Sequence, residues 1–95
     1  MLSANICTKS PMNFKTIIGD NIRGFRNMRK WTQARLGEES GLNGSYIGEV
    51  ERGEKNITAI KLCDVARVLK VKPFLFFIEG AYRKTPEEIR KALTP

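Results

Sequence analysis

Residues 33–53, with the sequence QARLGEESGLNGSYIGEVERG, decide the fold of this chain. Apolar residues with helical spacing lie on both sides of a short Gly-Leu-Asn turn. Thr32 and Asn43 each precede one of the two segments, and their side-chain oxygens can accept a free backbone N–H at a helix start. The glycine of the turn suits the left-handed end of the first helix. We therefore predict helices at residues 33–40 and 44–51, arranged as a helix-turn-helix.

The segments on either side of this motif also have helical spacing. Apolar residues upstream follow steps of four, four and three, at Phe14, Ile18, Ile22 and Phe25. Trp31 ends that segment, and we expect it to cover the core. Downstream, Thr58 can cap a helix whose apolar stripe consists of Leu62, Val65, Ala66 and Leu69.

Two shorter helices are predicted towards the C-terminus. Pro73 is suited to the first turn of a fifth helix, and Thr85-Pro86-Glu87-Glu88 has an N-cap, a first-turn proline and a capping-box glutamate. The sequence therefore predicts a compact all-α bundle of five helices, or six with the last one. We divide it into a flexible N-terminal arm at 1–12, a helix-turn-helix DNA-binding domain at 13–80 and a C-terminal extension with a short helix at 81–95.

Composition favours a polyanionic partner. The 95 residues suffice for one domain, and they carry a formal charge of +7 with a pI near 9.8. The longest apolar run, at residues 74–78, is far too short to cross a bilayer, and no signal peptide is expected. Cys7 and Cys63 are expected to be free thiols in a reducing cytoplasm, Cys63 as a small packing residue.

The sequence lacks the residue arrangements that catalytic and metal sites usually show. The chain has no histidine, no Cys or Asp cluster with metal-ligand spacing, and no phosphate-cradling glycine loop before a lysine. We therefore expect no enzyme activity, no metal and no cofactor, and a small-molecule effector is not expected.

The predicted helix at 44–51 can present one face to DNA while it buries the other. Ile47 and Val50 face inward, with Tyr46 and Glu51 at the edges of that stripe. Small residues on the outer face would let the helix backbone enter a major groove, where its N-terminal end usually contacts bases. The candidate base contacts are Asn43, Gly44, Ser45, Tyr46 and Glu49.

Phosphate contacts would set the position of this helix without reading sequence. The segment from Arg23 to Arg35 contains five cations and no anion. Such a run is either a DNA-facing stripe or a solvated face. Arg26 can instead pair with Glu51. The candidate phosphate contacts are Arg23, Gln33, Arg35, Gly48, Arg52, Lys55 and Asn56.

These residues carry a family resemblance over residues 18–78. The elements Trp31-Thr32-Gln33, Gly41-Leu42, Tyr46-Ile47, Glu51-Arg52-Gly53 and Asn56-Ile57-Thr58 resemble the lambda-repressor-like helix-turn-helix regulators, also called the Cro/C1 or xenobiotic-response-element type. The resemblance implies a lambda-repressor-like bundle that regulates transcription as a homodimer on a near-palindromic operator. The candidate dimer contacts are Phe74, Phe76, Phe77 and Ile78, because one helical stripe cannot bury so much apolar bulk.

Within that family, residues 41–58 resemble the controller proteins of restriction–modification systems. Those proteins typically carry a long polar residue where Gly44 stands, so the resemblance implies a different operator or specificity moved to Asn43, Ser45 and Tyr46. The family also usually has alanine in place of Gly37. A phage-type repressor, an antitoxin of the same fold and a protein-interaction module remain the alternatives. A membrane role is not expected.

Overall fold

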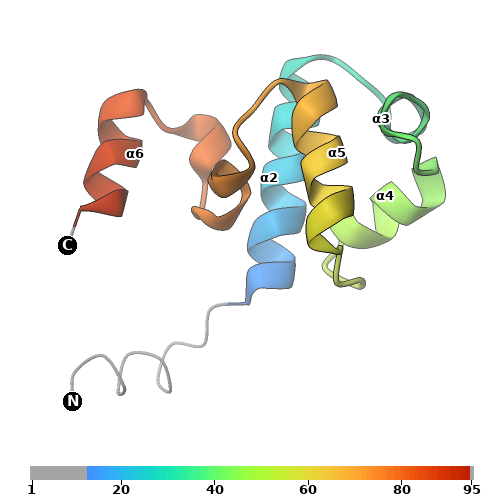
Figure 1. The fold of residues 1–95 in the computed structure, drawn as a ribbon, viewed down its shortest axis with the longest axis horizontal. Coiled ribbons are helices and arrows are strands. Elements are labelled where there is room, and N and C mark those ends of the chain that lie inside the picture. Colours follow the sequence, from blue (N-terminus) through green and yellow to red (C-terminus); the bar gives the residue numbers. More distant parts are fainter. Residues whose placement is uncertain (1–12, 95) are drawn as a thin grey trace.

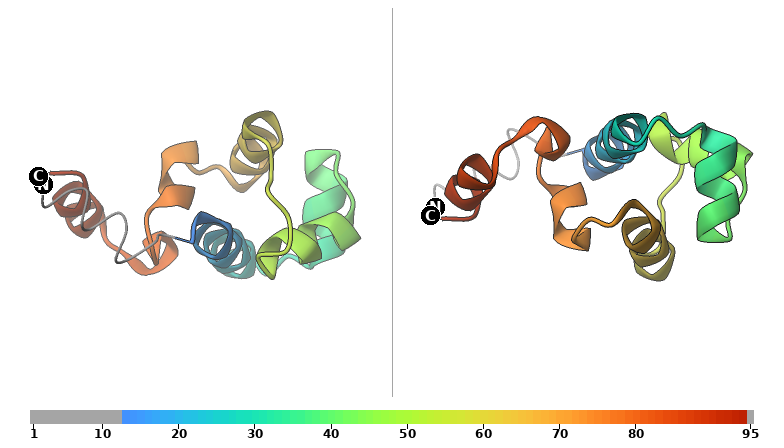
Figure 2. Two further views of the ribbon diagram at one scale, coloured as in Figure 1. Left: turned by 90° about the horizontal axis from the view of Figure 1, so that it is seen from below. Right: turned by 90° about the horizontal axis from the view of Figure 1, so that it is seen from above.

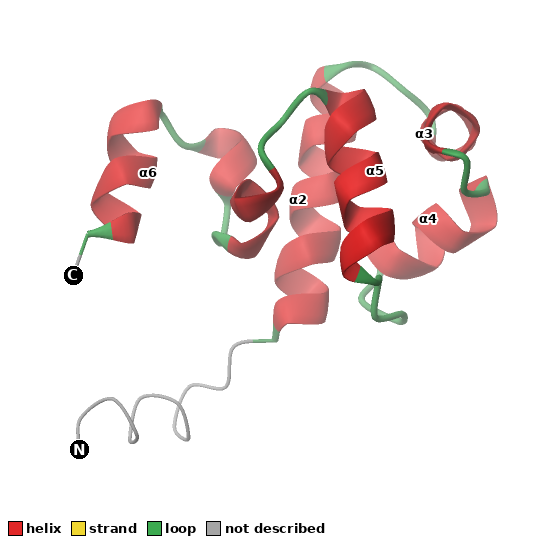
Figure 3. Ribbon diagram, in the orientation of Figure 1, coloured by secondary structure: helices red, strands yellow, loops and turns green. Residues whose placement is uncertain are grey.

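The computed structural model describes residues 13–94, and the arm predicted at residues 1–12 lies outside the described residues. Every regular element in the described range is helical, which confirms the all-α prediction (Figures 1 and 3). The elements are α2 (Phe14–Met28), α3 (Gln33–Ser40), α4 (Gly44–Glu51), α5 (Ala59–Leu69), the 3-10 helices η1 (Pro73–Phe77) and η2 (Ala81–Arg83), and α6 (Pro86–Leu93). The predicted fifth helix is therefore a 3-10 helix, and η2 was not predicted.

The helix ends follow the side chains that the sequence places there. Thr32 accepts a hydrogen bond from the backbone N–H of Arg35 at 2.9 Å, and Thr58 caps α5 in the same way. Gly41 has a φ of 81°, so it ends α3 in the left-handed conformation that glycine adopts without a steric penalty. Thr85 and Glu88 form the predicted capping box at the start of α6.

The core lies between α2, α4 and α5, with α3 and η1 closing its two ends (Figures 1 and 2). Its fully or nearly buried side chains are Ile18, Ile22, Leu36, Ile47, Val50, Leu62, Val65, Ala66, Leu69 and Phe76. They include all four residues of the predicted stripe at 62–69, but only Ile18 and Ile22 of the upstream stripe, since Phe25 is partly buried. Two expectations were wrong. Phe14 is 45% exposed, because it lies beyond the end of the core. Cys63 is exposed rather than packed, and it is free.

A buried asparagine attaches the C-terminal segment to α2, and sequence reasoning missed it. Asn21 is completely buried, and its side-chain amide nitrogen donates to the carbonyl oxygens of Phe76 at 3.0 Å and Ile78 at 2.8 Å. Its side-chain oxygen accepts from the backbone N–H of Tyr82 at 3.4 Å. This side chain thus satisfies backbone groups that the short 3-10 helices leave without partners.

Candidate nucleic-acid interface

Helices α3 and α4 pack backbone against backbone at the turn between them. A Cβ atom added at Gly37 would lie 2.6 Å from the carbonyl carbon of Asn43, and one added at Gly44 would lie 3.0 Å from the Cα of Ala34. The two helices therefore cross closely, and glycine is what permits it. Gly44 was expected on the outer face. It is instead half-buried, because the backbone of α3 packs directly against it where the two helices cross.

The inner face of α4 holds the side chains that the sequence predicted. Ile47 and Val50 are buried in the core. Tyr46 is half-buried against the core, and the ammonium group of Lys61 lies 4.8 Å from its ring centroid. Burial raises the pKa of Tyr46, with a smaller contribution from the nearby Glu49 carboxylate. Tyr46 is therefore tied to the α5 side of α4 and is less available to a DNA base than was expected.

The outer face of α4 is short and polar. Ser45 is exposed and Glu49 is half-exposed, four residues further along the same side of the helix. Asn43 is exposed at the N-cap, where its side-chain oxygen accepts from the backbone N–H of Tyr46 at 2.8 Å. The cap uses only the side-chain oxygen of Asn43, so its side-chain amide nitrogen is left to donate to another group.

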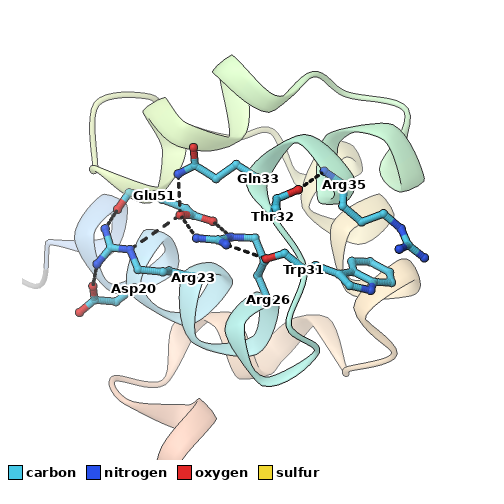
Figure 4. Close-up of polar contacts among 8 residues, drawn as sticks. All are labelled: Asp20, Arg23, Arg26, Trp31, Thr32, Gln33, Arg35 and Glu51. Carbon is cyan, nitrogen blue, oxygen red and sulfur yellow. Dashed lines mark hydrogen bonds and ion pairs between the residues drawn. The ribbon is translucent and has the colours of Figure 1, made fainter.

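A buried carboxylate fixes the C-terminal end of α4 (Figure 4). The Glu51 side chain is only 1% exposed, and its oxygens accept two hydrogen bonds from Arg26, at 2.6 and 2.9 Å. Arg26 also donates to the carbonyl oxygen of Trp31 at 2.8 Å. The predicted Arg26–Glu51 pair is thus confirmed, and it connects α2, α4 and the turn before α3. Arg26 belongs to this pair rather than to a surface stripe.

Two of the candidate phosphate contacts belong to the same network. Gln33 donates to Glu51 at 3.0 Å, and Arg23 donates to the backbone oxygen of Glu51 at 3.0 Å (Figure 4). Arg23 also approaches Asp20 at 3.5 Å, yet its side chain remains 45% exposed. Both residues are therefore held in position before any ligand arrives. Gln33 is half-buried, whereas Arg23 keeps exposed guanidinium surface.

Gly48 does not lie on the outer face, contrary to the sequence prediction. It is buried, because a Cβ atom added there would lie 3.1 Å from the side-chain oxygen of Gln33 and 3.2 Å from the guanidinium of Arg52. The missing side chain makes room for these two groups. Gly48 therefore contributes space for Gln33 and Arg52 beside α4, rather than an exposed contact of its own.

The remaining candidate phosphate contacts lie at the surface, on α3 and in the segment after α4. Arg35 pairs with Glu39 at 2.9 Å and lies over the Trp31 ring. Arg52 pairs with Glu54 at 2.8 Å, and this hydrogen bond lowers the pKa of the Glu54 carboxyl and raises that of Arg52. The exposed residues of the α4–α5 loop include Lys55 and Asn56.

The residues predicted for the dimer surface divide into two groups. Phe76 is completely buried in the core of its own subunit, so its assignment to a dimer surface was wrong. Phe74 and Phe77 are 45% and 46% exposed, and Ile78 is half-buried. Phe77 meets the ring of Phe14 edge-on, with the centroids 5.9 Å apart.

Helices α3 and α4 cross closely at a short turn, and a buried carboxylate fixes the end of α4. This is the architecture of a helix-turn-helix protein. A sequence profile described as helix-turn-helix matches residues 22–76. The control protein C.SmaI of Serratia marcescens is 42% identical over 69 residues, which cover 73% of this chain and 79% of that protein. The chain therefore belongs to the helix-turn-helix family of Cro/C1-type DNA-binding transcription regulators.

Solved structures of transcription regulators resemble this chain as well. The restriction-modification controller protein C.AhdI from Aeromonas hydrophila has a TM-score of 0.64 and 32% identity, and the match covers 66% of this chain and 96% of that one. The clp gene regulator ClgR from Corynebacterium glutamicum has a TM-score of 0.67 and 26% identity, over 84% of this chain and 85% of that one. The predicted resemblance to the controller proteins is confirmed.

The family also bears on the excluded functions. Its members are transcription regulators rather than enzymes, as the sequence predicted. Within residues 13–94, no three His, Cys, Asp or Glu side chains gather where they could hold a metal ion. None of the helices in that range is long and apolar enough to span a bilayer.

Proposed function

We propose that this chain is a restriction–modification controller, which binds a near-palindromic operator as a homodimer in the cytoplasm and regulates transcription there. The observation that carries the proposal is the division of α4. Ile47 and Val50 anchor its inner face, while Ser45 and Glu49 leave a polar outer face that fits a major groove. The formal charge of +7 and the 42% sequence identity with the control protein C.SmaI both support the proposal.

Base recognition is assigned to the exposed polar groups at the start and centre of α4. The Ser45 hydroxyl can donate or accept, the Asn43 amide nitrogen can donate, and the Glu49 carboxylate can accept from the amino group of a cytosine. Phosphate binding is assigned to the half-buried Gln33 and to exposed groups around α4, namely Arg23, Arg35, Arg52, Lys55 and Asn56. The proposed division keeps a DNA-binding unit at residues 13–80 and a C-terminal extension at residues 81–95.

Dimerisation is assigned to the exposed side chains of η1. Phe74 and Phe77 form an apolar surface that a monomer would leave in water, which supports a partner there. A two-fold dimer presents its two α4 helices about one DNA turn apart. The operator half-sites should therefore be separated by roughly 10 base pairs between centres.

The test compares binding to the duplex upstream of the chain's own gene with binding to a scrambled duplex. Ser45→Ala should weaken specific binding by about 1–3 kcal/mol and leave non-specific binding nearly unchanged. Glu38→Ala, at an exposed position of α3 without a proposed base contact, is the control. Equal loss on both duplexes would remove Ser45 from the set of base contacts. Neighbouring genes for a methyltransferase and an endonuclease would separate a controller from a phage repressor or an antitoxin.

A further inference from the structure

Lys61, in the first turn of α5, lies beside the N-terminal half of α4. Its backbone N–H donates to the side-chain oxygen of Thr58 at 3.2 Å, so the cap of α5 fixes the point from which the side chain extends. Its ammonium group lies 4.8 Å from the centroid of the Tyr46 ring on α4. A cation in this position is attracted to the negative face of the ring. The tyrosine therefore holds the Lys61 ammonium group close to α4.

This charge has no anionic partner in the described part of the chain. Lys61 is exposed, and among residues 13–94 no carboxylate forms an ion pair with it. Asp64, three residues further along α5, pairs instead with Arg67 at 3.6 Å. Because a neutral ring rather than a carboxylate holds the ammonium group, its full charge is left for an external anion.

An open hollow of about 490 Å³ lies between Lys61 and the N-terminal end of α4. Its lining consists of Gly41, Leu42, Asn43, Tyr46 and Lys61. Among the described residues that line it, Lys61 alone is charged. The hollow also borders Asn43, a proposed base contact at the N-cap of α4. A DNA strand that passes this end of α4 would therefore meet the Lys61 ammonium group.

The two sides of α4 differ in what they offer to DNA. At about 100° per residue, Gly44 and Tyr46 lie on nearly opposite sides of the helix, with Ser45 between them on the outer face. The Gly44 side packs on α3, which carries the proposed phosphate contacts Gln33 and Arg35. The Tyr46 side faces α5, which carries none. The major groove is about 12 Å wide, close to the diameter of a helix, so a helix inside it has a sugar–phosphate strand along each side.

We propose that Lys61 binds a backbone phosphate of the strand on the α5 side of the groove, and that Tyr46 positions its ammonium group for this contact. The inference rests on the proposed function in one respect, namely that α4 enters a major groove. It deepens that function in two ways. It adds a contact to the second strand, which the sequence prediction missed, and it lets Tyr46 act through its ring rather than through a base contact.

The test measures binding of the full chain to the duplex upstream of its own gene and to a scrambled duplex, over a range of salt concentrations. Lys61→Gln removes the charge and keeps a long polar side chain. It should weaken binding to both duplexes by the same factor, because a phosphate contact reads no sequence. The log–log slope against salt should become less steep by about 0.9 for each Lys61 in the complex.

Two control variants isolate the position of the charge. Lys91→Gln removes the same charge at an exposed site on α6, at the end of the molecule opposite α3 and α4, and should leave the slope unchanged (Figure 1). Lys61→Arg keeps a cation over the Tyr46 ring and should bind with the slope of the unmodified chain. Both sites are exposed, so urea unfolding should show that all three variants are as stable as the unmodified chain.

Two variants of Tyr46 test the positioning role. Tyr46→Phe keeps the aromatic ring and should leave both affinities unchanged. Tyr46→Leu removes the ring face and should weaken binding to both duplexes. In the Lys61→Gln background, the same change to leucine should have no further effect on binding. Loss of packing would instead weaken binding in either background.

The proposal is overturned if Lys61→Gln leaves the salt slope as steep as Lys91→Gln does, or if it weakens binding to the operator duplex alone. An effect of Tyr46→Phe confined to the operator duplex would overturn the positioning role, because the hydroxyl would then contact a base. Failure of the proposed function would look different. In that case the unmodified chain would show no preference between the two duplexes, whatever the slope of Lys61→Gln.

Discussion

Replacement of the buried Glu51 carboxylate should test how α4 is held in place. Glu51→Ala removes two hydrogen bonds from Arg26 and one from Gln33, and it leaves the Arg26 guanidinium facing Trp31 alone. Removal of one partner of a buried ion pair costs about 3–5 kcal/mol. The Arg26 side chain is 11% exposed and can turn partly towards water, so we expect a loss near the lower limit, about 3 kcal/mol.

Urea unfolding monitored by circular dichroism, at one fixed protein concentration, measures this loss. A domain of this length has roughly 5–14 kcal/mol of total stability, so the midpoint should move well outside experimental error. The control is Glu39→Ala, which breaks the exposed pair with Arg35 and should cost less than about 1 kcal/mol. The double variant Arg26→Met, Glu51→Met should regain most of the loss, because it leaves no unpaired buried charge. A cost for Glu51→Ala no larger than that of the control would refute the reasoning.

Three further expectations follow from the packing and the charge. Asn21→Leu should lower stability by about 2–4 kcal/mol in the same unfolding assay, because several buried carbonyl groups lose their donor; unchanged stability would show that water replaces the amide. Gly37→Ala should cost about 1–3 kcal/mol because α3 and α4 must separate, and an unaffected melting temperature would mean that this crossing is loose. DNA affinity should fall with salt, with a log–log slope near −0.9 per phosphate neutralised, and a flat dependence measured by fluorescence anisotropy would contradict the electrostatic contribution.

Local chemistry allowed most of the fold to be predicted from the sequence. Thr32, Asn43 and Thr85 cap helices because their side-chain oxygens act within three residues, and Gly41 ends α3 through its own backbone. The pairing of Arg26 with Glu51 was also foreseeable, since each residue borders the apolar stripe of its own helix and both stripes pack into one core.

The features that escaped prediction depend on contacts distant in sequence. The partners of Asn21 are 54 to 61 residues away, so nothing in its neighbourhood marks it as buried. Gly44 and Gly48 were placed on the outer face by helical periodicity alone, but α3 and the side chain of Gln33 cover them. Phe76 was grouped with its apolar neighbours, whereas a 3-10 helix directs it alone into the core.

The central claim is that the outer face of α4 reads DNA bases, and selection of bound duplexes from a random pool tests it most directly. The unmodified chain should enrich a near-palindromic site with half-sites roughly 10 base pairs apart. Glu49→Gln should change the preferred base at one symmetric position of that site and leave the spacing unchanged, because the carboxylate no longer acts as the acceptor for a base. Two results would contradict the claim. One is that the unmodified chain enriches no common site, and the other is that the unmodified chain, Glu49→Gln and Ser45→Ala all enrich the same site.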